Sequence, residues 1–233
     1  MSPKKKLEVE VPANHDQYID DVFSSPDFVE GVLSYLYEIV EENRRLRYEN
    51  SHDDLTGLFN KRAWKDIVED RIEGGKPFGV IFVDLNAFKA INDTFGHQKG
   101  DEVLRNFSKH IASKFSRQED AISHERLIGK QDEDKIPLGR IGGDEFGIIV
   151  DLGRVKDDGT TLEERMKRED DYTKEAVNEF VAQQPEEVRA LHFGVSLGSA
   201  IWYPDNPVSS IELIHQADQA MYIAKTANNE LAR

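Results

Sequence analysis

The segment that decides the fold is residues 138–151, which read LGRIGGDEFGIIVD. Two apolar stretches, 138–141 and 146–151, flank the short polar sequence GGDE at 142–145. Glycines and acidic residues between two apolar runs are typical of a hairpin turn. The segment therefore predicts two short antiparallel strands, with two carboxylates at the turn that joins them.

A buried strand is expected upstream, at residues 78–84 (FGVIFVD), because its continuous apolar run lies between turn signals. Asp84 closes this predicted strand. If the strand lies beside the hairpin, Asp84 meets Asp144 and Glu145 at one edge of the sheet. Carboxylates that converge in this way suit hard divalent cations and the phosphates that those cations carry. Each acid taken singly is equally well explained as a solvated strand end or a turn residue.

The remainder of the chain alternates between helical and strand patterns. Helices are expected at residues 60–71, 99–115, 162–181 and 209–226, and one more strand at 193–202. A charged, irregular stretch at 116–135 predicts a loop insertion. The order of these elements indicates one mixed α/β domain over residues 51–233.

The first fifty residues divide into two parts. Residues 1–26 are polar and acidic, contain three prolines and show no periodicity, so we expect a flexible arm. Residues 27–50 form a helix in our prediction, with a seam at alternating spacings of four and three. The seam residues are Val32, Leu36, Ile39, Asn43, Leu46 and Asn50. This pattern indicates either a parallel two-stranded coiled coil or an amphipathic helix packed on its own domain.

Composition excludes several classes of function. The net charge of −15 argues against non-specific binding of nucleic acid, which needs a basic face. The absence of cysteine excludes disulfides and thiolate metal sites, and it fits a cytoplasmic location. The longest apolar run is too short for a membrane span, and the basic residues 1–6 lead into no apolar stretch, so neither a membrane span nor a secretory leader is expected. A polyphosphate substrate would need divalent metal and locally placed cations.

Four ordered stretches resemble the GGDEF family of diguanylate cyclases. They are residues 52–60 (HDDLTGLFN), 84–101 (DLNAFKAINDTFGHQKGD), 140–146 (RIGGDEF) and 218–225 (DQAMYIAK). A single short match is weak evidence, whereas four matches in the family's order make chance a poor explanation. The resemblance implies a nucleotidyl-cyclase-like α+β domain, with a central, mostly antiparallel sheet flanked by helices and preceded by an N-terminal helix.

The resemblance also implies an activity, the condensation of two GTP molecules into cyclic di-GMP. It implies one or two Mg²⁺ (or Mn²⁺) ions on Asp84, the backbone carbonyl of Leu85, and Asp144. It implies that Asp144 or Glu145 helps to deprotonate the attacking 3′-hydroxyl and that Lys89 assists catalysis. The sequence does not divide the role of base between the two acids.

Further residues of the substrate site follow from the same resemblance. Asn92 and Asp101 would read guanine, because an amide beside a carboxylate matches the donors of that base. Lys89 and Lys225 would contact phosphate oxygens, and Phe88 belongs to the same site. Considered alone, each lysine is also explained as a solvated helix residue, and Asn92 as a turn or cap residue.

Partners are implied as well. One domain holds one GTP, so cyclisation implies a homodimer in which each copy delivers a 3′-hydroxyl to the other, and the helix at 27–50 is expected to pair the two copies. No sensor domain fits into residues 1–50, so we expect an upstream signalling protein. Asp53 is expected either to cap the helix near Asn60 or to pair with Arg140.

The sequence departs from the family in three places. The family's inhibitory Arg-x-x-Asp pattern occurs as Arg117 and Asp120, but the charged stretch separates it from the turn, so we expect weak feedback inhibition. Asn86 stands where the family more often has aspartate. Residues 228–230 (NNE) replace a glycine–arginine–asparagine segment, so one phosphate-binding arginine is missing, and the final short strand with it.

Three alternatives remain open. The first is a catalytically silent GGDEF domain that binds GTP or cyclic di-GMP and signals through protein contacts, although the intact sequence at 142–146 favours an active enzyme. The second is an enzyme with relaxed base choice, against which Asp101 argues. The third is a polymerase-like palm, which the acidic charge and the lack of a basic groove disfavour.

Overall fold

A computed structural model describes residue 23 and residues 25–115, 136–153 and 159–231. The chain divides into two units, Met1–Tyr48 and Glu49–Arg233, which are described separately. Three predictions lie outside the described residues. They are the flexible arm up to residue 22, the loop insertion at 116–135, and the inhibitory pattern of Arg117 and Asp120.

The N-terminal helix α2 runs from Pro26 to Ser51 and contains the stretch that we predicted as helical. None of its residues is buried. On the predicted seam, Leu36 is 50% exposed and Leu46 is 44% exposed. Side chains of this kind gain stability only when a partner covers them. The exposed seam is therefore compatible with pairing of two copies, which remains a prediction.

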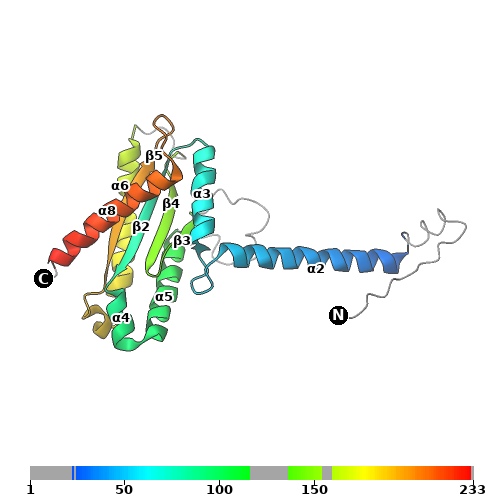
Figure 1. Ribbon diagram of the computed structural model, residues 1–233, viewed down its shortest axis with the longest axis horizontal. Coiled ribbons are helices and arrows are strands. Elements are labelled where there is room, and N and C mark those ends of the chain that lie inside the picture. The colour runs from blue at the N-terminus through cyan, green and yellow to red at the C-terminus, as the bar shows by residue number, and fades with distance from the viewer. Residues whose placement is uncertain (1–22, 24, 116–135, 154–158, 232–233) are drawn as a thin grey trace, which may run out of the picture. The chain divides into compact units, whose positions relative to one another are not determined.

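The second unit is built around a five-stranded sheet of order β1-β3-β4-β2-β5 (Figure 1). The strands are β1 (Phe59–Asn60), β2 (Phe78–Asn86), β3 (Leu138–Arg140), β4 (Glu145–Asp151) and β5 (Gly194–Trp202). The pair β1–β3 is parallel, and the pairs β3–β4, β4–β2 and β2–β5 are antiparallel. The predicted mixed fold with a mostly antiparallel sheet is confirmed.

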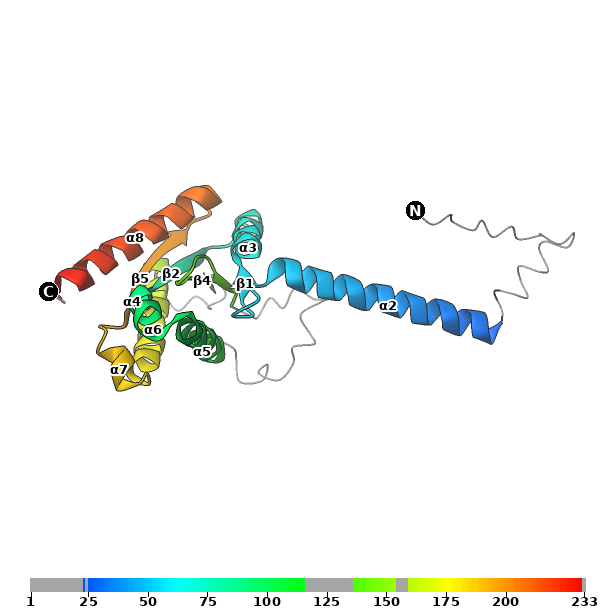
Figure 2. The ribbon, with the colours of Figure 1, turned by 60° about the horizontal axis from the view of Figure 1, so that its bottom comes forward.

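Helices cover both faces of this sheet. They are α3 (Lys61–Glu73), α4 (Phe88–Phe95), α5 (His97–Phe115), α6 (Leu162–Ala182), α7 (Glu186–Arg189) and α8 (Ser210–Leu231). Figure 2 shows α3 and α8 on one side of the strands and α5 and α6 on the other. None of the described helices has both the length and the apolarity that crossing a membrane would require.

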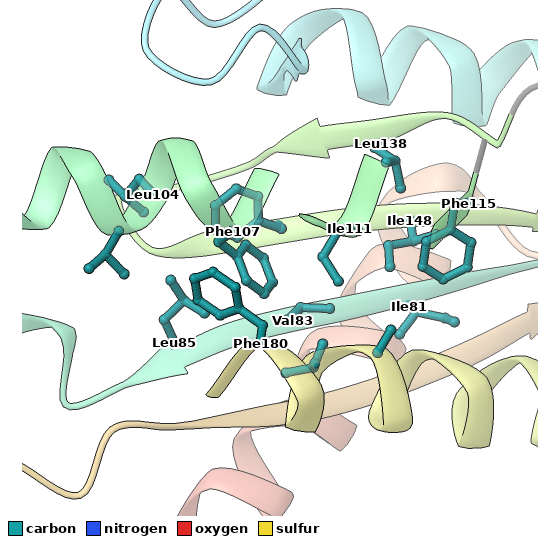
Figure 3. Close-up of a cluster of buried hydrophobic side chains, with 14 of the residues drawn as sticks. Ile81, Val83, Leu85, Leu104, Phe107, Ile111, Phe115, Leu138, Ile148 and Phe180 are labelled. Carbon is teal, nitrogen blue, oxygen red and sulfur yellow. The ribbon is translucent and has the colours of Figure 1, made fainter. Parts of the chain in front are cut away.

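Alternation along β2 divides the core into two clusters. Ile81, Val83 and Leu85 point towards α5 and α6, where Phe107 and Phe180 lie with ring centroids 5.2 Å apart (Figure 3). The alternate residues of β2, such as Val80 and Phe82, pack on the opposite face of the sheet. Their neighbours there are Trp64 of α3 and Leu213 and Ala217 of α8. Successive side chains of a strand point to opposite faces. Asp84 and Asn86 therefore belong to the face covered by α3 and α8.

Three short elements were missed by the sequence analysis: α4, α7 and β1. The helix α4 contains Asn92 in its second turn, so the interpretation of that residue as a turn residue is wrong. Only Phe88 and Ile91 of α4 are buried. Two apolar anchors in eight residues are too few to establish a period of 3.6, and packing on the core stabilises such a short helix more than propensity does.

Two of the predicted boundaries that differ from the structure bear on the site. The strand β2 continues to Asn86, so Asp84 does not close it. The strand is extended by two residues because Leu85 pairs with Val195 of β5 and Asn86 pairs with Gly194. The helix α8 continues to Leu231 rather than ending at 226.

Candidate active site

The carboxylates predicted to converge do so where β2 lies beside β4 and the turn before it. Asp84 lies in the middle of the row, opposite Glu145 of β4 on one side and Ser196 of β5 on the other. Directly opposed residues of neighbouring strands point to the same face of a sheet. Asp84 is only 3% exposed, which is rare for a carboxylate without a compensating charge. The predicted meeting of the strand and the hairpin turn is confirmed.

Backbone hydrogen bonds hold the turn at residues 142–145 against β2. The Leu85 amide donates to the carbonyl oxygen of Asp144 over 3.1 Å, and the Ile141 amide donates to that of Glu145 over 2.8 Å. Neither Gly142 nor Gly143 has a positive φ. A Cβ at Gly142 would lie 2.3 Å from Oε2 of Glu145. The first glycine is thus needed for the close approach of the glutamate rather than for a left-handed turn.

Arg140 fastens the turn to the entry segment of the domain. Its guanidinium donates from Nη2 to the carbonyl oxygen of Gly143 over 2.8 Å and from Nη1 to Oδ1 of Asp53 over 3.1 Å. The predicted pairing of Asp53 with Arg140 is confirmed. The alternative capping role is wrong, since Asn60 caps α3 itself by accepting from the Ala63 amide.

The pKa of the Asp53 carboxyl group lies below its ordinary value. Burial acts to raise it, but hydrogen bonds from Thr56 and the hydrogen bond and charge of Arg140 outweigh that effect. The side chain therefore prefers its charged form in the folded protein.

The two acids of the turn behave in the opposite way. Burial is the largest cause of the raised pKa of Asp144. The nearby charge of Asp84 raises this pKa further, while Lys225 acts to lower it. Burial also raises the pKa of Glu145, with added repulsion from Asp84, Asp144 and Asp218. Three acids are thus crowded at one corner of the sheet, and the positive charge near them does not balance their negative charge. A bound cation would relieve this repulsion, so such a corner favours cation binding.

Asp84 has one cationic partner in this corner. The ammonium of Lys225, on α8, lies 2.7 Å from Oδ1 and 2.8 Å from Oδ2 of Asp84. Apart from this ion pair, the buried Oδ1 has no hydrogen-bond partner among the described residues. A carboxylate has about four acceptor positions, so Asp84 retains capacity for a metal ligand bond.

The donor set fits a hard divalent cation. Oxygen ligands are what Mg²⁺ and Mn²⁺ prefer, and they need no histidine or cysteine. The described parts of the chain hold no ready cluster of three or more histidine, cysteine, aspartate or glutamate side chains around one point. A metal ion here would therefore combine a few carboxylates with a backbone oxygen, which is the composition expected for Asp84, Leu85 and Asp144.

The residues expected to read guanine lie where α4 and α5 meet. A Cβ at Gly100 would lie 2.0 Å from Oδ1 of Asn92, so the absence of a side chain there admits the asparagine. Asp101 follows directly on α5, and it is half-buried like Asn92. The structure thus brings the predicted amide and carboxylate to neighbouring turns, although their role as guanine contacts is a prediction.

The remaining expected substrate residues are placed differently. Phe88 is packed in the apolar core with 9% of its surface exposed, which gives its ring a structural role. Lys89 is exposed beside it at the start of α4. That helix begins directly after Ala87, whose φ of 60° turns the chain out of β2. The free amides of a helix start can supplement a lysine in binding phosphate.

Sequence analysis missed several residues of this corner. Asp218 and Lys61 act on the pKa of Glu145 from α8 and α3. Ser196 is 1% exposed and hydrogen-bonds both Asn86 and Asn228. Ser196 is the one polar residue on its face of the predicted strand, and this was the available signal for it.

A separate open hollow of about 370 Å³ lies towards the other end of β5. Its lining includes Met166, Asp170, Ser199 and Tyr203, and none of the predicted site residues. Ser199 donates to Asp170 over 2.7 Å, and Tyr203 donates to Glu163 over 2.8 Å. Four polar side chains of this hollow are thus paired with one another, whereas the carboxylate corner has acids in excess, so the corner is the stronger candidate for chemistry.

Comparison with known proteins identifies the domain. The family model described as "Diguanylate cyclase, GGDEF domain" matches residues 50–230. The uncharacterized protein Rv1354c of Mycobacterium tuberculosis (strain ATCC 25618 / H37Rv) is 35% identical over 193 residues, which are 82% of this chain and 26% of that protein. Diguanylate cyclase DosC of Escherichia coli (strain K12) is 31% identical over 204 residues, covering 84% of this chain and 37% of DosC. The chain thus spans well under half the length of these relatives.

A solved structure shares the architecture. It is the crystal structure of the coiled coil and GGDEF domain of DgcB from Caulobacter crescentus in complex with c-di-GMP. The match has a TM-score of 0.63 and covers 85% of this chain and 93% of that chain, at 22% sequence identity. At that identity the likeness supports the fold alone.

Proposed function

This chain belongs to the GGDEF family, and on that premise we propose that it is a diguanylate cyclase that joins two GTP molecules into cyclic di-GMP. The observation that carries the proposal is the convergence of Asp84, Asp144 and Glu145 on one corner of the sheet. Both acids of the turn have raised pKa values, and crowded carboxylates of this kind are typical of functional sites.

The proposed reaction is a double phosphoryl transfer. The 3′-hydroxyl oxygen of one GTP bonds to the α-phosphorus of the other, and the bond from that phosphorus to the pyrophosphate leaving group breaks. The hydroxyl proton passes to a base. Repeating the step with the roles exchanged closes the ring, so two GTP yield one cyclic di-GMP and two pyrophosphates.

Asp84, the backbone carbonyl of Leu85, and Asp144 would hold Mg²⁺ or Mn²⁺. When bound, the metal neutralises charge on the triphosphate and on the departing pyrophosphate. The buried Asp84 is held in place by strand pairing on both sides, and the Asp144 backbone is tied to Leu85. Ligands that are fixed before binding cost little to organise.

Glu145 and Asp144 are the candidate bases for the 3′-hydroxyl proton. A raised pKa brings a carboxylate closer to the working pH, which improves it as a proton acceptor. Lys225 and Lys89 would contact phosphate oxygens. Both ammonium groups supply the local positive charge that an acidic chain must provide to bind a polyphosphate.

Guanine would be read by Asn92 and Asp101 at the contact of α4 and α5. The carboxylate accepts from the N1–H and N2 amino group of guanine, and adenine offers no such pair of donors. A site with buried polar groups discriminates strongly against an analogue that leaves them unpaired. We therefore propose a preference for GTP over ATP.

Two copies are needed if each domain holds one GTP. We propose a homodimer paired through α2, along the seam that includes Leu36, Ile39 and Leu46. Asparagines at 43 and 50 would favour two parallel strands at some cost in stability. A strict monomer in sedimentation, at a concentration where the enzyme is fully active, would contradict this pairing.

The input to the enzyme would come from outside the described domain. We propose that an upstream signalling protein acts through α2, and that the reaction takes place in the cytoplasm, where GTP is available.

The second candidate function is a silent GGDEF domain that binds GTP or cyclic di-GMP without turnover. The observation that favours it is the asparagine pair at 228 and 229, where the family carries a glycine and a phosphate-binding arginine. Binding without product would select this alternative.

The deciding experiment is incubation of the full chain with GTP and Mg²⁺, followed by chromatography against cyclic di-GMP. We expect product from the parent and none from Asp144→Ala. Asp151→Ala is the matched control, because it removes an aspartate at the opposite end of β4. Product from Asp144→Ala at the parental rate would contradict the assigned metal site. No product from the parent, with GTP still bound, would contradict the cyclase.

A further inference from the structure

A chain of neutral hydrogen bonds crosses the sheet beside Asp84. The hydroxyl of Ser196 donates to Oδ1 of Asn86 over 3.1 Å, and it accepts from Nδ2 of Asn228 over 3.2 Å. Ser196 itself is 1% exposed. We call Asn86, Ser196 and Asn228 the amide relay. It joins three segments that are distant in the sequence, namely the end of β2, the first residues of β5 and the last turn of α8.

Both ends of the relay are positions at which this chain departs from its family. Asn86 stands in place of the more usual aspartate, and Asn228 stands in place of a glycine. A glycine at 228 would offer no side chain to Ser196 and would favour the end of the helix. In this chain the helix instead continues past that position to Leu231. The two departures are thus linked through a single buried serine.

The relay lies one helical turn from the lysine that pairs with Asp84. Lys225 and Asn228 are three residues apart on α8, so their side chains leave the same side of the helix. One reaches Asp84 and the other reaches Ser196, and these two residues are directly opposed on β2 and β5. The end of α8 is therefore attached to the sheet at two adjacent points.

Neutrality of the relay also matters for Lys225. A second carboxylate at position 86 or 228 would add negative charge near the ion pair of Asp84 and Lys225, and opposite charges attract. Amide groups form the hydrogen bonds without that added charge. Lys225 thereby stays directed at the carboxylate corner.

We propose that Asn228 and Ser196 are positioning residues, which hold the last turns of α8 on the sheet so that the Lys225 ammonium is aimed at the phosphates of bound nucleotide. The inference rests on the proposed function, because the phosphates are those of GTP. The hydrogen bond from Asn228 would fix the end of α8 in a chain that lacks the family's phosphate-binding arginine after Lys225.

The test measures binding rather than turnover. Isothermal titration calorimetry with 3′-deoxy-GTP and Mg²⁺, on the full chain, reports affinity for a nucleotide that lacks the attacking hydroxyl. We expect Asn228→Ala and Ser196→Ala each to weaken binding roughly five- to tenfold, the effect of one lost hydrogen bond. Asn178→Ala, an exposed asparagine on α6, is the matched control and should bind as the parent does. Parental affinity in Asn228→Ala would overturn the proposal.

A cycle with Lys225 separates positioning from general destabilisation. If Asn228 acts through the lysine, Asn228→Ala should have no further effect on binding in a Lys225→Met background. Independent, multiplicative losses would overturn the positioning role. Because Asn228 is exposed, its variant is expected to fold even if Ser196→Ala does not.

A measurement without ligand makes failure of this inference distinguishable from failure of the proposed function. Amide hydrogen exchange at residues 225–231 should become faster in Asn228→Ala and stay unchanged in Asn178→Ala. Binding of 3′-deoxy-GTP by a parent that makes no product would overturn the cyclase and leave the positioning role standing. A parent that does not bind the nucleotide would overturn both.

Discussion

The two sides of Asp84 are held by different kinds of interaction. On the hairpin side, the turn at 142–145 is fastened by backbone hydrogen bonds and by the guanidinium of Arg140, and its acids repel one another. On the α8 side, one ion pair from Lys225 is accompanied by neutral amide and hydroxyl contacts, and the helix backbone is pressed onto β5 at Gly198.

The two sides of Asp84 differ in what their residues contribute to the protein. The hairpin side carries an electrostatic cost, which a cation would relieve, so under the proposed function its acids contribute to chemistry more than to stability. The α8 side depends on close packing and on satisfied polar groups, so its residues mainly maintain geometry. Variants on the two sides should therefore separate into losses of activity and losses of stability.

The largest effect is expected at the residue that both sides share. Asp84→Asn retains the shape of the side chain but removes the charge that would bind metal and pair with Lys225. We expect the rate of cyclic di-GMP formation to fall by about 100-fold or more, since metal-assisted charge neutralisation contributes several kcal/mol. Chromatographic product assays check this, with Asp151→Asn as the control. A variant rate within threefold of the parent would remove Asp84 from the metal site.

The packing of α8 is tested by a pair of glycine substitutions. A Cβ at Gly198 would lie 1.9 Å from the backbone nitrogen of Met221, which cannot rotate away. We expect Gly198→Ala to lower the free energy of unfolding by about 3 kcal/mol or more. Gly143→Ala should change it by less than about 0.5 kcal/mol, because nothing lies within 4 Å of the added atom. Urea unfolding measures both, and equal losses would contradict the contrast between the two sides.

The fastening of the turn is tested at Arg140. Arg140→Ala removes the hydrogen bonds to Gly143 and leaves the half-buried Asp53 without its guanidinium partner. We expect a loss of about 2 kcal/mol in the free energy of unfolding. Arg105→Ala, an exposed position on α5, is the control and should have little effect. A loss no larger than that of the control would show that backbone bonds alone maintain the turn.

The smallest effect is a gain of stability from removing an acid. The pKa of Asp144 is raised above 3.8 in the folded protein, so its charged form opposes folding at neutral pH. Asp144→Asn should therefore raise the melting temperature at pH 7. The corresponding gain in the free energy of unfolding should be less than about 1 kcal/mol, because the site is partly solvated. The gain should shrink as the pH falls through the raised pKa of Asp144 and vanish below 3.8, where the parent's Asp144 is protonated in both states.

Asp53→Asn is the control, because its change in stability is expected to have the opposite sign. The pKa of Asp53 is lowered below 3.8, so its charge stabilises the folded state above that pH. The variant should melt below the parent at pH 7, and the deficit should shrink only as the pH falls below 3.8. Addition of Mg²⁺ should raise the melting temperature of the parent but not of Asp144→Asn. A destabilised Asp144→Asn at pH 7 would contradict the electrostatic account of the turn.

The hairpin could be predicted because its information is local. The strands β3 and β4 and the acids between them lie within fifteen consecutive residues, and the apolar run of β2 indicates a buried strand by itself. Their adjacency was only a condition of the sequence analysis, and the pairing of β2 with β4 fulfils it. The end of β2 could not be placed, because the ladder beyond Asp84 depends on pairing with β5.

Short elements and contacts between distant segments escaped prediction for a related reason. The helix α4 has only two buried anchors, and its existence depends on the core that receives Phe88 and Ile91. The direction of Lys225 could not be read from its sequence neighbours, since the same lysine is equally at home in solvent near a helix end.

The amino-acid sequence by itself determined the mixed α/β fold, the hairpin with its acids, and the order of the four stretches that mark the family. Only the tertiary structure decided that Asp84 lies between Glu145 and Ser196, that Lys225 pairs with it, and that Asn86 and Asn228 meet at one serine. The physical reason is that periodicity and turn chemistry act between near neighbours in the chain. A hydrogen bond between distant segments exists only once strand register and helix packing have brought its donor and acceptor within about 3 Å.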